Sequence, residues 1–498
     1  MKRAAGILLP VFSLPSKHGI GCFSKEAYSF IDWLSGAGQS YWQILPLCPT
    51  SFGDSPYQSF STFAGNPYFI DPDAFVSKGW LTERECIDAN FGLDDFYVKY
   101  DKLYQKRFHL LKKAFERSNI ADSEEYRCFV SENAGWLDNY SLFMAVKEHF
   151  GGASWDTWDD DIRFREEKAI ERYSSELSDE IEFQRFMQYE FHVQWDALKA
   201  FANSRGIKII GDIPIYVAYD SADVWANRNL FRLNSDGIPT AVAGCPPDGF
   251  SETGQLWGNP LYDWDIHRRD GYKWWIERIR ASFELYDTVR IDHFRGFDSF
   301  YAIPYGAETA VSGNWEKGPG IELFKAVESA LGQRDFIAED LGFITDSVKK
   351  LVEDCGFPNM KVLEFAFDSR DTGSRSEYLP HNYASNCVAY TGTHDNQTIM
   401  SWFRNISSDE QRTAREYLHD FCTPSYRLNE SFIALLMRSC ADTVIIPIQD
   451  YLGLDDSSRI NIPSTIGKNW QWRLESSQLT DRLQQKILKM AQLFSRDK

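Results

Sequence analysis

Eight short apolar segments, separated by stretches with helical periodicity, constrain the fold of this chain more than any other feature of its sequence. The segments are rich in β-branched residues, and most contain an acidic residue. Such near-continuous apolar runs are typical of parallel strands that helices cover. Eight is also the number of strands that a closed parallel barrel needs. The expected strands are 6–10, 41–47, 207–217, 288–294, 334–341, 361–367, 386–395 and 443–450.

We therefore expect an α/β fold, a TIM (β/α)8 barrel in which residues 1–498 form a single catalytic unit. An open doubly wound sheet is the alternative for these units, and it would suit a dinucleotide-dependent enzyme. However, neither a Gly-x-Gly-x-x-Gly loop nor a Walker-type phosphate loop follows any of the segments. Only 26 residues follow Trp472, which is room for one closing helix and too short for a C-terminal β-sandwich domain.

Two long gaps between the expected strands predict large insertions. Residues 48–185, after the second strand, begin as a loop and continue as a mainly helical subdomain. Residues 227–260, after the third strand, contain a segment at 244–258 with several Pro and Gly and two aromatic rings, which is typical of an active-site lid. Because the loops after the strands build the active-site face of a barrel, both insertions should border the substrate cleft on its C-terminal face.

The charge balance excludes several classes of partner. The chain has 53 Lys and Arg against 72 Asp and Glu, a net charge of −19, and offers no basic stripe for phosphate backbones or anionic lipid. No uninterrupted apolar run approaches the roughly 18 residues of a membrane span. We therefore expect neither a nucleic-acid nor a membrane partner. The 36 Phe, 16 Trp and 24 Tyr suit a neutral, hydroxyl-rich ligand, although most of these rings should pack in the core.

The cysteines and the N-terminus both indicate the cytoplasm. Nine cysteines with wide spacing and no Cys-x-x-Cys pair indicate neither a disulfide framework nor a structural zinc site. Lys2-Arg3 and the apolar residues after them resemble a signal peptide, but Gly6 and Pro10 interrupt the run and no small-x-small cleavage site follows. The helical His spacing of zinc enzymes is absent too, so we expect no metal and no cofactor.

Carboxylates at strand ends are the strongest chemical signal. Asp212, Asp292, Glu339 and Asp395 lie at the ends of the third, fourth, fifth and seventh expected strands, and the strand ends of a barrel converge on one mouth. Arg290 shares a strand face with Asp292 and favours the ionised carboxylate that a nucleophile must be. Glu339 has small and apolar neighbours, and partial burial would raise its pKa as a general acid requires. A nucleophile, an acid and a third carboxylate predict a retaining glycosidase-type site.

Several motifs of the chain resemble one family. Arg290-Ile-Asp-His, Ala338-Glu-Asp-Leu-Gly and Thr393-His-Asp-Asn resemble blocks of the α-amylase clan. Gly53-Asp-Ser-Pro-Tyr and Gly254-Gln-Leu-Trp-Gly-Asn-Pro are similar to blocks of one branch of that clan. This branch is the 4-α-glucanotransferases of glycoside hydrolase family 77, also called amylomaltase or disproportionating enzyme. The resemblance runs from residue 4 to about residue 473, nearly the whole chain.

The resemblance implies a reaction and roles for individual residues. Asp292 would be the nucleophile, Glu339 the acid/base and Asp395 the stabiliser of the transition state. The enzyme would move α-1,4-glucan segments through a covalent glucosyl-enzyme, with retention, to the 4-hydroxyl of an acceptor such as glucose or maltose. The donor would be a maltooligosaccharide or a starch- or glycogen-type glucan. Candidate substrate-binding residues are Tyr57, Asp212, Asp248, Phe250, Trp257, Arg290, His394, Phe365 and Asn461.

Two other functions remain open at this point. A plain α-1,4-glucan hydrolase would use the same three carboxylates, and only the expected lid and the family resemblance favour transfer. A non-catalytic glucan-binding or scaffold protein is the second alternative, and the presence of all three acids argues against it. The sequence does not decide between a monomer and a homodimer.

Overall fold

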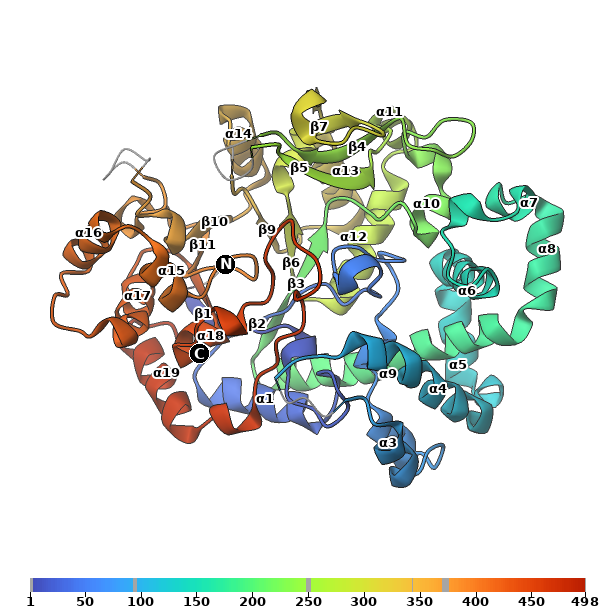
Figure 1. The fold of residues 1–498 in the computed structure, drawn as a ribbon, viewed down its shortest axis with the longest axis horizontal. Helices are drawn as coiled ribbons and strands as arrows, with labels where there is room; N and C mark the ends of the chain where they lie inside the picture. Colours follow the sequence, from blue (N-terminus) through green and yellow to red (C-terminus); the bar gives the residue numbers. More distant parts are fainter. Residues whose placement is uncertain (1–2, 93–95, 248–251, 343, 370–375, 498) are drawn as a thin grey trace.

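Eight parallel strands close into a barrel in the computed structural model, which describes residues 3–92, 96–247, 252–342, 344–369 and 376–497. The order around the barrel is β1-β12-β11-β10-β9-β6-β3-β2 (Figure 1). Each expected segment overlaps one of these strands, although β1 and β10 begin two residues before the expected ranges, and the predicted TIM barrel is confirmed. The barrel strands are β1 (Ala4–Leu8), β2 (Tyr41–Gln43), β3 (Lys208–Pro214), β6 (Thr288–Asp292), β9 (Phe336–Ala338), β10 (Asn359–Val362), β11 (Cys387–Tyr390) and β12 (Thr443–Pro447).

Alternate residues of these strands form two separate apolar cores. Side chains such as Ile210, Met360 and Tyr390 make a cluster of their own in the barrel interior. Their strand neighbours, such as Ile209 and Val289, belong to the large cluster that the outer helices also join. Because side chains on a strand point alternately to opposite faces, a residue two positions beyond an interior one also points inward. The interior face therefore leads directly to the mouth of the barrel.

Several strands end earlier than their apolar runs. The sixth run was expected to be a strand to residue 367, but β10 stops at Val362 and the chain turns into a 3-10 helix at Leu363–Phe365. Phe365 therefore does not lie on a strand, contrary to the prediction. Asp395 likewise lies in a loop beyond the end of β11 at Tyr390. After β10 the apolar residues continue into the 3-10 helix, and a run of apolar residues does not distinguish the two conformations. After β11 the residues 391–395 are mostly polar, and the strand ends with the apolar run.

Helices surround the barrel, and α9 (Ser178–Ser204) links it to the first insertion. The C-terminal half of α9 packs on the barrel side, where the Trp195 indole donates to the Leu285 carbonyl. In its N-terminal half, Phe186 contacts the rings of Phe75 and Phe115 in the insertion. The expected boundary at residue 185 thus falls inside one continuous helix. Helices on the barrel include α1 (Lys25–Gly36), α12 (Lys273–Leu285), α13 (Ile321–Leu331), α14 (Asp346–Cys355), α17 (Leu428–Met437) and α19 (Asp481–Leu493).

The first insertion is mainly helical and occupies the right side of Figure 1. Its first part, up to the helix at residue 72, consists of loops and short 3-10 turns. Thr82 begins one of the helices with a capping box, in which its side chain and that of Glu85 satisfy each other's backbone N–H groups. The helices are α2 (Pro72–Ser77), α3 (Glu83–Ala89), α4 (Tyr100–Ser118), α5 (Glu124–Glu132), α6 (Ala134–His149), α7 (Asp160–Arg163) and α8 (Glu167–Glu176).

A four-stranded antiparallel sheet, which the sequence analysis did not predict, lies beside the barrel mouth at the top of Figure 1. Its order is β5-β4-β7-β8, and the expected lid connects β4 to β5. The chain between the barrel strands β6 and β9 supplies the other half of the sheet. The strands are β4 (Ala241–Cys245), β5 (Gln255–Pro260), β7 (Ser299–Pro304) and β8 (Asn314–Lys317).

Within the described ranges, no helix is both long enough and apolar enough to cross a lipid bilayer.

The residues after α19 return to the N-terminal end of the barrel, where Arg496 holds the chain ends together. The Arg496 side chain is fully buried. Its guanidinium donates hydrogen bonds to the backbone carbonyls of Ala4, Met437, Ser439, Ala441 and Asp442.

We expect Arg496→Ala to lower the free energy of unfolding by roughly 3 kcal/mol or more, because it leaves several buried carbonyl groups without a donor. Urea unfolding should show this loss, while kcat of the folded enzyme at 25 °C stays unchanged. Arg412→Ala is the matched control, since 66% of that side chain is exposed. Equal urea midpoints for both variants would contradict the assigned role of Arg496.

Candidate active site

Three charged side chains of β3 and β6 meet at the base of the mouth. Asp212 and Arg290 are partners in the register of the two strands. The Arg290 guanidinium lies 2.6 Å from Asp212 Oδ2 and 3.0 Å from Asp292 Oδ1. Asp212 and Arg290 are buried, whereas 28% of the Asp292 side chain is exposed and open to a ligand. Arg290 therefore fixes the position of Asp292 and leaves part of its carboxylate accessible.

Glu339 lies directly after β9 and is oriented by two backbone groups. Its Oε2 accepts a hydrogen bond from the His293 N–H at 2.6 Å, and its Oε1 accepts one from the Leu341 N–H at 3.0 Å. His293 has φ of 51°, a left-handed conformation that is uncommon for a residue with a side chain. Since His293 follows Asp292 directly, this turn brings the backbone of the β6 end into contact with Glu339.

Asp395 is held by its neighbour and by a distant loop. His394 Nε2 lies 3.3 Å from Asp395 Oδ2, and the Asn461 side-chain amide donates to Asp395 Oδ1 at 2.6 Å. The Asp395 side chain is 42% exposed, so a ligand in the cleft can reach it. Asn461 was predicted to bind substrate, and the structure places it against one of the three predicted catalytic carboxylates.

Burial separates the pKa values of these carboxyl groups. It raises the pKa of Asp292 to about 6, with Arg290 opposing the rise and Asp212 and Asp395 adding to it. It raises the pKa of Glu339 to about 7, against the effect of Arg290 and with that of Asp292. The expected effect of Arg290 on Asp292 thus has the predicted direction, but burial outweighs it.

The pKa of Asp395 moves the other way. Burial by itself would raise it, but the charge and hydrogen bond of His394 and the hydrogen bond of Asn461 lower it to about 2. Asp395 in turn raises the pKa of His394, against the effect of the burial of that imidazole. Near neutral pH the mouth therefore combines a carboxylate that stays ionised, Asp395, with a carboxyl group whose pKa is near neutrality, Glu339, which is the distribution of charge that acid/base chemistry at an acetal needs.

The predicted aromatic binding residues lie in different environments. Tyr57 stacks on the His394 ring at 5.2 Å between centroids, and its hydroxyl donates to Asp212 Oδ2 at 2.7 Å. Trp257, on β5, contacts the His293 ring edge to face at 4.8 Å. Phe365 is half-buried and packs against Tyr378, at 5.4 Å. Two further predicted residues, Asp248 and Phe250, lie outside the described residues.

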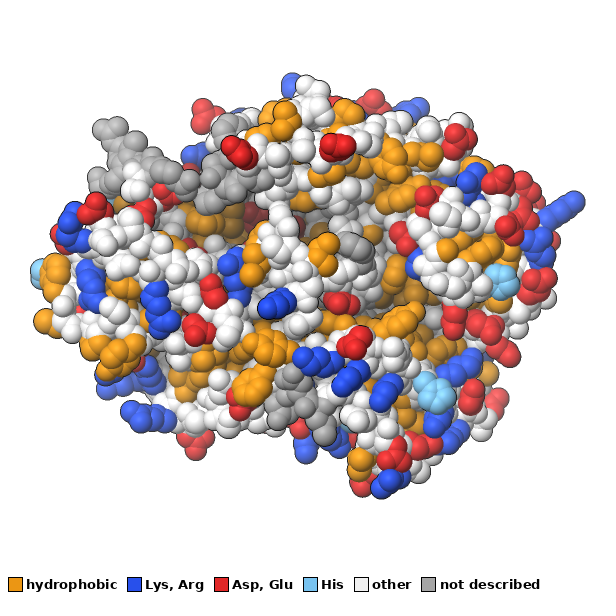
Figure 2. All heavy atoms as spheres, in the orientation of Figure 1, with side chains coloured by type: hydrophobic (Ala, Val, Ile, Leu, Met, Phe, Trp, Pro, Cys, Tyr) orange, Lys and Arg blue, Asp and Glu red, His pale blue; other side chains and the backbone are white. Residues whose placement is uncertain are grey.

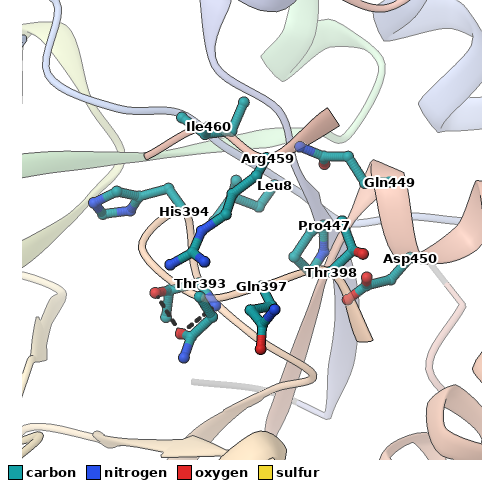
Figure 3. A pocket seen from close by; sticks show the side chains of 11 residues that line it. Leu8, Thr393, His394, Gln397, Thr398, Pro447, Gln449, Asp450, Arg459 and Ile460 are labelled. Carbon is teal, nitrogen blue, oxygen red and sulfur yellow. Dashed lines mark hydrogen bonds between the residues drawn. The ribbon is translucent and has the colours of Figure 1, made fainter. Parts of the chain in front are cut away.

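Two residues of the site, Trp470 and Arg459, were not predicted from the sequence. Trp470 is buried, with its ring 5.8 Å from that of Tyr57 and 6.0 Å from that of His394. The Arg459 side chain reaches toward the loop of Thr393 and His394 in the close-up of Figure 3. Both follow the last barrel strand, where the sequence has no strong motif. A Trp in an otherwise polar segment was the one available signal for Trp470.

Within the part of the chain that the structure describes, one group of side chains has the spacing of a metal site. His18 Nε2 lies 3.4 Å from a carboxylate oxygen of each of Asp71 and Asp73, and the Lys17 ammonium lies 2.8 Å from Asp73. These residues belong to the first loop and the start of α2, not to the barrel mouth. The lysine already neutralises one of the two carboxylates, so the cluster is accounted for as an ion-pair network.

The surface agrees with the acidic composition. Figure 2 shows acidic and basic side chains interspersed on one face of the molecule, with hydrophobic patches between them.

Known proteins are similar to this chain over its whole length. A family model described as 4-alpha-glucanotransferase matches residues 9–480. The 4-alpha-glucanotransferase of Clostridium butyricum is 46% identical over 488 residues, which cover 98% of this chain and 99% of the relative. That of Thermus thermophilus is 44% identical over 505 residues, with coverage of 100% and 99%.

The solved structures agree with this result. The amylomaltase from Streptococcus agalactiae, determined in complex with acarbose, matches with a TM-score of 0.96 at 42% identity and 100% coverage of both chains. The barrel fold and the sequence comparisons therefore agree. The chain belongs to the 4-alpha-glucanotransferase family and is an enzyme of that activity.

Proposed function

We propose that the chain transfers α-1,4-glucan segments by a retaining mechanism in which Asp292 is the nucleophile, Glu339 the acid/base and Asp395 the stabiliser of the transition state. The observation that carries this proposal is the pair of half-buried carboxyls at the ends of β6 and β9 with raised but different pKa values. The backbone of His293, next to Asp292, joins them. Two carboxyls whose pKa values differ can serve as nucleophile and acid at the same pH.

In the first step, the Asp292 carboxylate attacks the anomeric carbon of the donor. Arg290 holds Oδ1 of Asp292, which leaves Oδ2 as the attacking oxygen. The glycosidic C–O bond breaks as Glu339 delivers its proton to the departing oxygen, and a glucosyl ester on Asp292 results. Positive charge develops on the sugar during this step, and the ionised Asp395 stabilises it.

In the second step, Glu339 acts as a base. Its carboxylate takes the proton from the 4-hydroxyl of an acceptor such as glucose or maltose while that oxygen attacks the anomeric carbon. The ester bond to Asp292 breaks and the nucleophile is regenerated. Two inversions at one carbon give net retention.

Transfer exceeds hydrolysis only if water is kept from the ester until an acceptor binds. The β4–β5 hairpin supports such exclusion, because Trp257 from β5 covers His293 beside both acids. We infer that the connection at 244–258 is the lid and that 48–185 and 227–260 are insertions into one catalytic barrel. Tyr57, Asp212, Trp257, Arg290, His394 and Asn461 are the described residues that we assign to substrate binding at this mouth, with Phe365 the weakest candidate. A relative solved in complex with acarbose supports a carbohydrate ligand.

Incubation with maltotriose tests the proposal. We expect glucose together with a ladder of oligosaccharides longer than maltotriose, visible by chromatography or mass spectrometry. If every product is shorter than the substrate, the enzyme is an α-1,4-glucan hydrolase and the transfer proposal is wrong.

The cysteines bear on the compartment. None of the nine, all of which lie in the described ranges, is joined in a disulfide, which supports a reducing compartment, and we propose the cytoplasm.

A further inference from the structure

A short segment after the last barrel strand, residues 459–461, forms hydrogen bonds with the loop that carries Asp395. The Asn461 N–H donates to the His394 carbonyl at 3.1 Å, and the Asn461 side chain donates to the Asp395 carboxylate at 2.6 Å. The Arg459 Nη2 donates to the Asp395 carbonyl at 2.6 Å. Both polar groups of Asp395 that accept hydrogen bonds, the carbonyl and the carboxylate, thus have donors from residues 459–461.

Arg459 also organises this segment itself. Its Nε donates to the Asn461 carbonyl at 2.7 Å. The Nε–H and Nη2–H bonds leave the same edge of a guanidinium in parallel, so one planar group holds the Asp395 and Asn461 carbonyls side by side. Figure 3 shows this side chain extending from the β12 side of the pocket toward Thr393 and His394. Moving the guanidinium would therefore move Asp395 and its carboxylate donor together.

The remainder of the loop is anchored from the same side of the barrel. The buried Asp450 accepts hydrogen bonds from the Thr391 hydroxyl and from the Ile399 N–H. Asp456 accepts hydrogen bonds from the Gln397 side chain and the Thr398 N–H. These contacts hold the two ends of the loop, whereas the contacts of residues 459–461 are those at its centre.

We propose that Arg459 is a positioning residue for Asp395: its guanidinium fork fixes the backbone of Asp395 and the amide of Asn461 that binds the Asp395 carboxylate. This inference rests on the proposed role of Asp395 in stabilising the transition state. Both of these hydrogen bonds of Arg459 end on backbone carbonyls, so in this proposal Arg459 acts through Asp395. A lysine keeps the charge but has a single ammonium in place of the two parallel N–H bonds, so it restores the geometry only in part.

The test is a double-mutant cycle on Arg459 and Asp395. We expect Arg459→Ala to lower kcat about 100-fold, since displacement of a catalytic group by about 1 Å has an effect of this size, and to leave KM within about twofold. Arg459→Lys should recover part of that loss. In an Asp395→Asn background, Arg459→Ala should change the rate less than about twofold, because the group that it positions is already absent. Rates are measured as fluoride release from α-maltotriosyl fluoride, whose good leaving group keeps slow variants measurable, and Arg412→Ala is the surface control.

The outcomes separate this inference from the proposed function. If Asp395→Asn keeps full activity, the role of Asp395 is wrong. If Asp395→Asn loses activity but Arg459→Ala is as active as the wild type, only the positioning role is overturned. An equal loss in both backgrounds also overturns it, since Arg459 then acts independently of Asp395. Thermal unfolding of each variant checks that it is folded. If Arg459→Ala does not fold, the same double-mutant cycle is measured with Arg459→Lys.

Discussion

Asp292→Asn is expected to lower kcat on maltotriose by more than about 10⁴-fold, because an amide cannot form the glucosyl ester. The fold should survive the change. Asparagine has the same shape and keeps an oxygen for the hydrogen bond from Arg290. Burial raises the pKa of Asp292, so its ionised form is disfavoured in the folded protein and the neutral amide should be tolerated. We therefore expect a melting temperature near neutral pH equal to or above that of the wild type.

The matched control is Asp409→Asn, the same chemical change at a carboxylate with 79% of its side chain exposed. It should leave both kcat and the melting temperature unchanged. A folded Asp292→Asn variant with wild-type activity would show that the nucleophile is another group.

Glu339→Gln is expected to separate the two steps of the reaction. On maltotriose, kcat should fall about 10³-fold, because the leaving sugar must be protonated. On α-maltotriosyl fluoride the first step needs no acid, so we expect a burst of fluoride equal to the enzyme concentration. The second step lacks its base, and mass spectrometry of a digest should find a maltotriosyl adduct on the peptide containing Asp292. Glu416→Gln, at a side chain with 60% exposure, is the control.

The Glu339→Gln variant also tests the pH dependence of kcat/KM. The wild type needs Asp292 ionised and Glu339 protonated, so kcat/KM should fall below about pH 6 and above about pH 7. Glu339→Gln removes the group that loses its proton on the alkaline side, and the alkaline decline should disappear. If the decline persists unchanged in this variant, another residue is the acid.

Much of the barrel could be predicted from the sequence because apolar runs identify parallel strands whatever their partners. The ends of the strands could not be predicted as well. Phe365 was misplaced on a strand because the 3-10 helix after β10 is as apolar as the strand. Asp395 was misplaced because the expected strand was extended over the polar residues after Tyr390. The antiparallel sheet was missed because not all of its strands are continuous apolar runs: β8 is mostly exposed, and the first four residues of β5 are partly buried or exposed. Arg459 and Trp470 were missed because their partners lie more than 60 residues away in the chain.

The sequence by itself determined the fold class, the carboxylates and the motifs of the family, because each depends on local pattern or on residue identity. Only the tertiary structure decided the pKa values of those carboxylates. Glu339 and Asp395 are both acids in loops over one mouth. Glu339 has a pKa near 7 because burial outweighs Arg290, and Asp395 has one near 2 because His394 and Asn461 outweigh burial. His394 is the sequence neighbour of Asp395, but Arg290 and Asn461 come close to the acids only through the fold, and burial and charge at close range are properties of the folded chain alone.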